Sequence, residues 1–417
     1  MPGSAAGKPV RIPWGSWFGD TEVTLEFPGS WDVGFYPPAD GPDIGEEGIR
    51  RAFANPIGTP RISDLARGKR SAVIVVDDLS RPTPAYRVLP TYLDELAAGG
   101  IDRDHVLIII GVACHRQLIR EDMEKKLGRE VLETVQVKNH FAWDNCAYLG
   151  VTSRGTPVHV NRDFLAAELK LTLGGITPHG GPGFGGGAKL VLPGVAGIET
   201  SHANHRPPEA GGPGKRGVNR VDDNEQRLDM EEAARIAGLD AIVNTVINSR
   251  RGIAGLFVGD MVAAHRAGVE FARKVFATKV PANVDVGVFN AYPKDTEFVQ
   301  AGMAFNVWQN TRRPIVREGG TIVLCTASSE GYGFHSLHGP SMRLSNTRSP
   351  RQLFGDRQLV IFCPNIIRRD LPAEAQADEG LILCRTWGEV AGVLERRHGA
   401  GARVAVFPCS AMQLAEE

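Results

Sequence analysis

The sequence predicts an α/β protein of two domains, each built on a mostly parallel sheet. The chain has 417 residues, which is more than one hydrophobic core usually organises. Short apolar runs alternate with stretches of helical period, as strands and crossover helices do in βαβ units. This alternation starts afresh near residue 281. We therefore predict an N-terminal domain over residues 1–280 and a C-terminal domain over residues 281–417 that closes over an active site in the crevice between them.

The predicted strands of the N-terminal domain are short and almost wholly apolar. Residues 21–36 alternate apolar and polar side chains around a Pro-Gly break, which fits either a short antiparallel hairpin or edge strands. Buried strands are then predicted at 71–76, 105–110, 132–137 and 169–175, and helices at 86–98, 118–127 and 224–237.

The C-terminal domain repeats the pattern. The sequence predicts a strand at 283–289, a helix through 300–317, and strands in the segments GGTIVLCT, QLVIFCP, GLILCR and ARVAVFP.

Composition limits the classes of partner. The formal net charge is -1, and no basic run is interleaved with aromatic residues, so nothing favours nucleic acid or an anionic membrane surface. No window reaches the roughly 18 to 20 apolar residues of a membrane span, and the N-terminal segment lacks the apolar core of a signal peptide. The six cysteines include no C-x-x-C pair, which argues against a zinc ribbon or a disulfide framework. We expect a cytoplasmic protein that acts on a small molecule.

Three loops follow predicted strands of the first domain: VVDDLSRPTP, GVACHRQ and GITPHGGPGFGGGAK. Ligands of open parallel sheets bind at the carboxyl ends of the strands, so these loops should bring Asp78, Arg81, His115 and His179 towards one crevice.

The glycine-rich stretch 174–194 (GGITPHGGPGFGGGAKLVLPG) places Lys189 among apolar residues. Such a loop could present backbone N–H groups to a phosphate, but it matches neither the Walker A pattern nor the G-x-G-x-x-G spacing, and a purely structural turn is the competing interpretation. A lysine in a dry pocket can bond covalently to a carbonyl or acyl group, or it can simply lay its stem along apolar surface.

The polar side chains of these loops suit chemistry beside a carboxylate. His115 and His179 could each be a general base, because imidazole titrates near neutral pH, although either could be an ordinary loop histidine. The planar fork of Arg81 suits a carboxylate, and Asp77 or Asp78 could orient that arginine or a histidine. A salt bridge that merely pins the loop explains the same residues.

His202 and His205 form an H-x-x-H pair, which would share one face of a helix and could be half of a metal site. Such a pair more often lies on a helix surface without a metal.

These residues stand in motifs that resemble the nickel-pincer-dependent lactate racemase family along most of the chain. The motifs are DDLSRPTP at 77–84, CHR at 114–116, PHGGPGFGGGAKLVLPG at 178–194 with His205 downstream, and YPKDTEFVQA at 292–301. The resemblance implies nickel and a pyridinium-3,5-dithio-type mononucleotide that is covalently attached to Lys189, with His205 as a nickel ligand. It also implies contacts to this cofactor from Asp78, Gly185, Gly186 and Gly187.

The resemblance further implies the reaction and its remaining residues. The activity would be racemisation or epimerisation of a small 2-hydroxy acid by reversible hydride transfer from Cα to the nickel-pincer nucleotide, with cofactor-assembly proteins as partners. His115 and His179 would be the acid and base, one for each face of the carbinol. The substrate would contact Arg81, Gln300 and Met303.

Two departures from the family pattern bear on the substrate. Met303 stands where the family tends to have a lysine, and GVACHRQL lacks the threonine and proline that commonly flank the histidine and arginine. A pocket without that cation would be more apolar, so we expect lactate or a longer aliphatic 2-hydroxy acid. Two alternatives stay open: a non-catalytic carrier of the nickel-pincer nucleotide, and a nickel-free enzyme that uses Lys189 as a Schiff base. His202 is expected to be structural or to support the ligand.

Overall fold

The structure is a computed structural model that describes residues 7–206, 215–344, 353–378 and 380–416. The chain folds into two compact units. Unit 1 comprises Met1–Ala39, Phe276–Phe334 and Leu344–Glu417, and unit 2 comprises Asp40–Val275 and His335–Arg343. The location of the site in a crevice between two domains stays a prediction.

Unit 2 contains a six-stranded sheet in the order β13-β12-β9-β4-β5-β6. Its strands are β4 (Ala72–Asp77), β5 (Val106–Gly111), β6 (Gln136–Asn139), β9 (Leu169–Gly175), β12 (Ala241–Ile247) and β13 (Ile253–Gly259). All neighbours run parallel except the antiparallel pair β12 and β13. Every residue of β4 is buried, as expected for the middle of a parallel sheet that is covered on both faces. The mostly parallel sheet is thereby confirmed.

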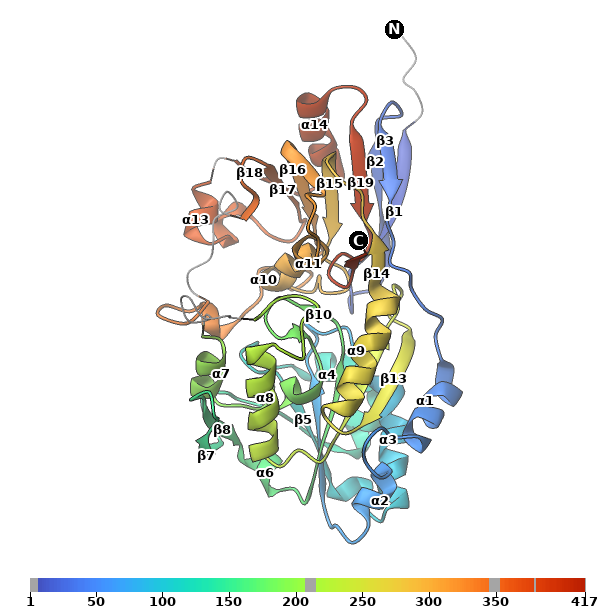
Figure 1. The fold of residues 1–417 in the computed structure, drawn as a ribbon, viewed down its shortest axis with the longest axis vertical. Helices are drawn as coiled ribbons and strands as arrows, with labels where there is room; N and C mark the ends of the chain where they lie inside the picture. The colour runs from blue at the N-terminus through green and yellow to red at the C-terminus, as the bar shows by residue number, and fades with distance from the viewer. Residues whose placement is uncertain (1–6, 207–214, 345–352, 379, 417) are drawn as a thin grey trace. The chain divides into compact units, whose positions relative to one another are not determined.

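The helices of unit 2 largely follow the sequence prediction. Those predicted at 86–98, 118–127 and 224–237 appear as α3 (Ala85–Ala98), α4 (Arg120–Leu127) and α8 (Glu225–Ile236), whereas α9 (Ala263–Phe276) was not predicted. Figure 1 shows α8 and α9 in front of the strands of this sheet. The smaller elements are α1 (Gly45–Ala54), α2 (Ile62–Ala66), α5 (Arg129–Thr134), α6 (Arg162–Ala166), α7 (Ile198–Asn204), and the antiparallel pairs β7 (Cys146–Val151) with β8 (Pro157–Asn161) and β10 (Pro178–His179) with β11 (Gly183–Phe184).

The strand predicted at 132–137 is wrong in its first half. Helix α5 continues to Thr134, and β6 begins only at Gln136. Local contacts one turn apart favour the helix here: Arg129 Nε donates to Glu133 at 2.9 Å, and Thr134 Oγ1 donates to the Glu130 carbonyl at 2.8 Å. Short apolar runs such as this one fit a helix and a strand equally well.

Unit 1 contains a second sheet of six parallel strands in the order β18-β17-β16-β15-β19-β3. The five predicted C-terminal strands are β15 (Val284–Asn290), β16 (Val316–Cys325), β17 (Gln358–Phe362), β18 (Leu381–Cys384) and β19 (Arg403–Phe407). The sixth, β3 (Asp32–Phe35), lies at the edge, beside β19. The other elements are β1 (Lys8–Trp14), β2 (Thr21–Phe27), β14 (Ala277–Lys279), α10 (Phe298–Ala301), α11 (Asn306–Gln309), α13 (Ala373–Gln376), α14 (Trp387–His398) and β20 (Leu414–Glu416).

Two sequence predictions for unit 1 differ from the structure. Strand β2 pairs with β1 rather than with β3, so the hairpin alternative for residues 21–36 is wrong, whereas the edge-strand alternative holds for β3, which joins the C-terminal sheet at its edge. The pairing of β3 with β19 connects the N-terminal segment to the C-terminal sheet within unit 1, whereas the prediction placed residues 1–280 in one domain. The helix predicted through 300–317 ends with α11 at Gln309, and Pro314 disfavours helical backbone in the residue before it.

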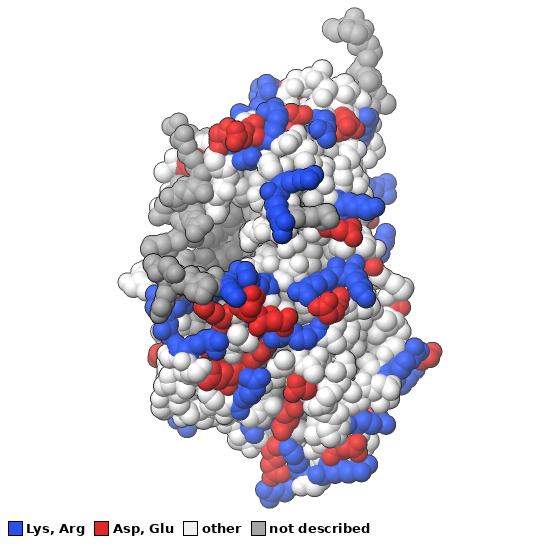
Figure 2. Space-filling view, in the orientation of Figure 1, with Lys and Arg blue, Asp and Glu red and all other residues white. Residues whose placement is uncertain are grey.

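The described residues include no helix that is both long and apolar enough to cross a membrane. On the face drawn in Figure 2, basic and acidic side chains are interspersed in small groups, in keeping with the net charge of -1.

His140 is a buried histidine that supports unit 2. The side chain is fully enclosed; its Nε2 lies 2.9 Å from the Ala196 carbonyl, and its Nδ1 lies 3.2 Å from the Asn161 amide nitrogen. A carbonyl only accepts, so Nε2 carries the proton and Nδ1 accepts from Asn161. Burial lowers the pKa of His140 to about 4.

Stability should therefore fall as the pH is lowered. An unfolded histidine titrates near pH 6.5, so between about pH 6.5 and 4 the unfolded chain binds a proton that folded His140 does not. As the pH falls through this window, the burial of neutral His140 should lower the free energy of unfolding by at most about 3 kcal/mol. Urea unfolding at several pH values would measure the loss, and His140→Gln should reduce the slope. An unchanged slope in that variant would contradict this role.

Candidate active site

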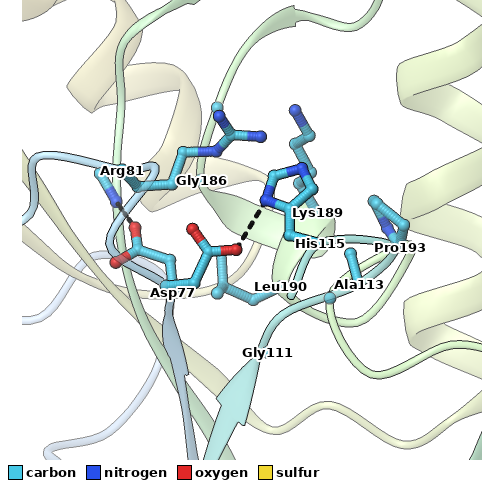
Figure 3. A pocket seen from close by; sticks show the side chains of 13 residues that line it. Asp77, Arg81, Gly111, Ala113, His115, Gly186, Lys189, Leu190 and Pro193 are labelled. Atoms are coloured by element: carbon cyan, nitrogen blue, oxygen red, sulfur yellow. Dashed lines mark hydrogen bonds and ion pairs between the residues drawn. The ribbon is translucent and has the colours of Figure 1, made fainter. Parts of the chain in front are cut away.

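The candidate site is a pocket in unit 2 at the carboxyl ends of three neighbouring strands. Strand β4 lies between β9 and β5, so the loops after these strands converge, as the sequence predicts. The pocket opens to solvent, and its empty space, counted together with that open mouth, is about 410 Å³. Its lining residues are Asp77, Asp78, Arg81, Gly111, Ala113, His115, Gly175, Gly185, Gly186, Lys189, Leu190, Pro193 and Gly194. Figure 3 shows the side chains of Arg81, His115 and Lys189 extending to the same side of the strand ends.

His115 is oriented by Asp78. Its Nδ1 lies 2.8 Å from Asp78 Oδ2, and both side chains are 6% exposed. Burial alone would raise the pKa of Asp78, but its contact with His115 and the charge of Arg81 keep that pKa well below its usual value, so the carboxylate is ionised. An ionised carboxylate only accepts, so Nδ1 of His115 carries a proton and, in the neutral ring, Nε2 keeps its lone pair. This orientation leaves Nε2 able to accept a proton, which is what a general base requires.

Ser80 holds the other oxygen of Asp78. Both its backbone N–H, at 2.8 Å, and its hydroxyl, at 2.5 Å, donate to Asp78 Oδ1. The Asp78 side chain is therefore fixed by its own loop on one side and by His115 on the other. The sequence prediction that an aspartate of this loop could orient a histidine is consistent with this geometry.

Asp77, the last residue of β4, has a different set of partners. Its Oδ1 lies 2.5 Å from Nζ of Lys126, a fully buried residue of α4. Its Oδ2 accepts from Thr83 Oγ1 at 2.6 Å and from the Gly175 N–H at 3.1 Å. Lys126 Nζ also donates to the carbonyls of Asp78 and Arg81 at 2.9 and 3.1 Å. One buried ammonium group thus ties the loop that carries Asp78 and Arg81 to the sheet and to α4.

Replacing Lys126 by methionine should destabilise the protein by about 3 to 5 kcal/mol, because the buried Asp77 carboxylate would lose its counter-charge. Urea unfolding would measure this loss. Lys125→Met, at an exposed position of the same helix, should change stability by less than about 0.5 kcal/mol. Adding Asp77→Asn to Lys126→Met should recover part of the loss. A double variant no more stable than Lys126→Met would indicate that the ion pair is not the cause.

Two buried side chains, an arginine and a histidine, hold the glycine-rich loop in place by donating hydrogen bonds to its carbonyls. Arg227 of α8, which is fully buried, donates to the carbonyls of Pro182, Phe184 and Gly186, and His265 of α9 donates from Nε2 to the Gly185 carbonyl at 2.9 Å. Burial lowers the pKa of Arg227 to about 10, which leaves it charged at neutral pH. Neither α8 nor α9 contributes to the pocket lining; they fix the loop that does.

Two loop N–H groups are also used within the protein. Gly185 N donates to the Thr177 carbonyl at 2.8 Å, and Gly187 N donates to Asn244 Oδ1 at 2.7 Å. Gly186 has φ +72°, and a Cβ there would lie 2.1 Å from Asn244 Oδ1. The glycines are therefore required for close packing against β12 and for a left-handed turn. A phosphate-binding role for Gly185, Gly186 and Gly187 stays a prediction, and the N–H groups of Gly185 and Gly187 already have protein partners.

Lys189 and His205 belong to the same neighbourhood. Lys189 is buried in the short 3-10 turn Gly187–Leu190 and lines the pocket. His205 follows the last residue of α7, and its Nδ1 lies 2.7 Å from the Ser201 carbonyl. Burial first, and then the charges of Lys189 and Arg216, lower the pKa of His205 to about 4, although its bond to Ser201 opposes this. The neutral ring therefore donates from Nδ1 and keeps a lone pair on Nε2.

The other predicted site residues lie apart from this pocket lining. His179 is in β10 and accepts from the Gly181 N–H through Nδ1 at 3.2 Å. Gln300, in α10, and Met303, in the 3-10 turn that follows, belong to unit 1. His202 lies within α7, so the helical segment expected for the H-x-x-H pair is present up to Asn204. The roles predicted for these residues stay predictions.

Sequence reasoning missed three residues around the pocket. Lys126 carries no motif, and only its burial in the folded protein reveals its function. Ser80 lies inside the recognised DDLSRPTP motif but was given no role. His335 lies far along the chain in the segment FHSLH, and its ring centroid is 4.9 Å from that of His115. A second histidine three residues later was the only local signal.

The fold and the site define an α/β enzyme whose pocket, at the strand ends of one sheet, contains a histidine oriented by an aspartate, an arginine and a buried lysine. The family model described as the lactate racemase N-terminal domain matches residues 18–211. The chain is 28% identical to the lactate racemase of Lactiplantibacillus plantarum over 389 residues, which are 87% of this chain and 89% of that protein. It is 32% identical to the lactate racemase of Thermoanaerobacterium thermosaccharolyticum over 292 residues, which are 69% of this chain and 67% of that protein.

Solved structures show the same relationship. The lactate racemase apoprotein from T. thermosaccharolyticum superposes with a TM-score of 0.76 at 25% identity, covering 98% of this chain and 100% of that one. A Thermotoga maritima protein shares the fold, with a TM-score of 0.67 at 17% identity, covering 90% of this chain and 99% of that one. The chain belongs to the lactate racemase family, and it is an isomerase.

Proposed function

We propose that the enzyme racemises a small 2-hydroxy acid, lactate or a longer aliphatic homologue, with a nickel-pincer nucleotide attached to Lys189. The observation that best supports this proposal is the His115–Asp78 pair, which shares one pocket with Arg81 and Lys189. The family relationship supports lactate as a substrate, since one lactate racemase matches 87% of this chain and a second matches 69% of it.

The residues present fit such a cofactor. Lys189 offers an amine in a pocket whose lining includes several glycines, and His205 offers an imidazole Nε2 lone pair, which is a suitable ligand for nickel. The described residues contain no cluster of three or more His, Cys, Asp or Glu side chains able to hold a metal ion. A nickel ion that arrived with a bound nucleotide would need few ligands from the protein, and His205 would be the residue to hold it. When bound, this cofactor would accept hydride from the substrate Cα and return it.

The protein would supply the acid, the base and the substrate orientation. Arg81 would bind the carboxylate through two parallel hydrogen bonds and so fix the position of Cα. His115 would remove the hydroxyl proton through Nε2, with Asp78 stabilising the imidazolium that results. His179 would act in the same way on the opposite face, because the two enantiomers present their hydroxyl groups from opposite sides. Proton transfer of this kind contributes roughly 10² to 10⁴ in rate.

The residues of unit 1 would decide the side chain accepted. Gln300 would contact polar groups of the substrate, and Met303 would present a thioether where a lysine would present a charge. A thioether packs well against alkyl groups and binds a second carboxylate poorly. The proposed substrates are therefore monocarboxylates with an aliphatic side chain.

The test uses protein that is co-expressed with the cofactor-assembly proteins and contains nickel. Each enantiomer of lactate and of 2-hydroxybutyrate is incubated with it, and chiral chromatography follows the enantiomer ratio. We expect both enantiomers to approach an equal mixture. Turnover of dicarboxylates or sugar acids alone would overturn the aliphatic assignment. Nickel-loaded protein that changes no 2-hydroxy acid would instead support a cofactor carrier.

A further inference from the structure

A segment from the C-terminal part of the chain packs on the loop that carries His115. Residues His335–Arg343, here named the histidine arm, are grouped with unit 2, although the residues on both sides of them are grouped with unit 1. Two backbone contacts attach the arm: an isolated antiparallel bridge between His115 and His335, and a hydrogen bond from Ser336 N to the Cys114 carbonyl at 2.7 Å. The arm therefore adds a short strand-like pairing to the loop after β5.

The side chain of His335 lies against the ring of His115. The two ring centroids are 4.9 Å apart with an interplanar angle of 53°, and His338 packs edge-on against His335 at 5.3 Å. Nδ1 of His335 accepts from the Leu337 N–H at 3.2 Å, so the neutral ring carries its proton on Nε2. Burial, followed by the charges of His115, His338, His205 and Arg81, keeps the pKa of His335 far below its usual value. His335 is thus a neutral aromatic neighbour of His115.

Such a neighbour has two physical effects on His115. Asp78 contacts His115 at Nδ1, so the imidazole ring could still tilt about that hydrogen bond. The ring of His335, whose centroid lies 4.9 Å from that of His115, limits this tilt. In addition, His115 becomes a cation whenever it holds the substrate proton. A neutral aromatic ring attracts a nearby cation, whereas a second cation at that distance would repel it.

We propose that His335 is a positioning residue for His115, which it holds by ring packing in the orientation required for proton transfer. The inference rests on the proposed function in one respect, namely that His115 is the base. The arm would then complete the site from a part of the chain that the strand-end loops do not include. The residue acts through His115 and needs no contact with the substrate.

The test compares His335→Ala, which removes the ring, with His335→Phe, which keeps a neutral ring of similar shape. The full-length protein is labelled with ¹³C-histidine, and the Cε1–Hε1 signal of His115 is assigned by its loss in His115→Gln. The kcat and KM for lactate are measured on nickel-loaded protein. His159→Ala removes another partly buried histidine, which packs on Tyr148 in the β7–β8 pair, and is the matched control.

In His335→Ala the His115 signal should shift and broaden, and kcat should fall roughly 10- to 100-fold with KM changed by less than about twofold. His335→Phe should restore most of kcat and a sharp signal, and the control should match the wild type. An unchanged His115 signal in His335→Ala would overturn the inference whether or not lactate is turned over. Equal losses in the alanine and phenylalanine variants would overturn it as well. If the wild type racemises nothing, the proposed function fails, and the signal comparison still decides the role of His335.

Discussion

Replacing Lys189 by alanine is expected to abolish both attachment of the nucleotide and racemisation. The wild-type chain, co-expressed with the cofactor-assembly proteins, should show a mass increment of one modified nucleotide and stoichiometric nickel. The alanine variant should show neither, because the amine that would form the covalent bond is gone. Lys189 is buried on the pocket wall among glycine residues that the protein holds rigidly, so no other lysine of this lining could replace it. Intact-protein mass spectrometry and metal analysis would measure both quantities.

Two further variants separate the tether from other roles of the lysine. Lys189→Arg keeps a positive charge but offers no amine for the bond, so it should also lack the mass increment. Lys125→Ala, at an exposed position, should keep the increment and the activity. An unmodified, nickel-free wild type from that host would remove the nickel mechanism. A Lys189→Ala protein that keeps both nickel and turnover would show that the attachment lies elsewhere.

Replacing His115 by glutamine should lower kcat by roughly 10² to 10⁴, with a small change in KM, because the substrate carboxylate would still bind Arg81 while the proton acceptor is lost. The glutamine side chain can keep a hydrogen bond to Asp78, so the loop should stay folded. Asp78→Asn should also lower kcat, since an amide no longer requires the proton of His115 to sit on Nδ1. Initial rates from each enantiomer would be measured separately.

The control for His115 is His105→Gln, an exposed histidine just before β5, which should leave both rates unchanged. If His179 serves the opposite face, His179→Gln should give a loss of similar size. A His115→Gln enzyme within about tenfold of the wild type for both enantiomers would contradict its role as the base.

The sequence predicted the sheet of unit 2 well because its strands are continuous apolar runs that end in polar loops. Strands β4, β5 and β9 follow that pattern, and their adjacency explains why Arg81, His115 and Lys189 share a pocket. The antiparallel pair β12 and β13 was not predicted, although both strands are largely apolar, because neither contains a candidate catalytic or ligand-binding residue that drew attention to it.

Long-range packing decided what the sequence could not predict. Strand β3 ends at Phe35 and joins a sheet whose other strands begin only at Val284, and no local pattern records that partner. The same holds for Lys126, whose importance comes from the carboxylate that it meets. It holds for His335 too, which reaches His115 only through the arm. Local patterns predict which elements form, whereas tertiary contacts determine which side chains work together.

Asp77 and Asp78 are adjacent in the sequence but contact different partners, and this limits insertions and deletions in β4. Successive side chains at the end of a strand point in opposite directions, so one carboxylate reaches Lys126 and the other reaches His115. Inserting one residue in β4 would carry Asp77 to the position beside His115 and move Asp78 beyond it, whereas deleting one would carry Asp78 to the position beside Lys126 and leave His115 without its carboxylate. The length of this strand is therefore constrained by two contacts at once, the ion pair with Lys126 and the hydrogen bond to His115.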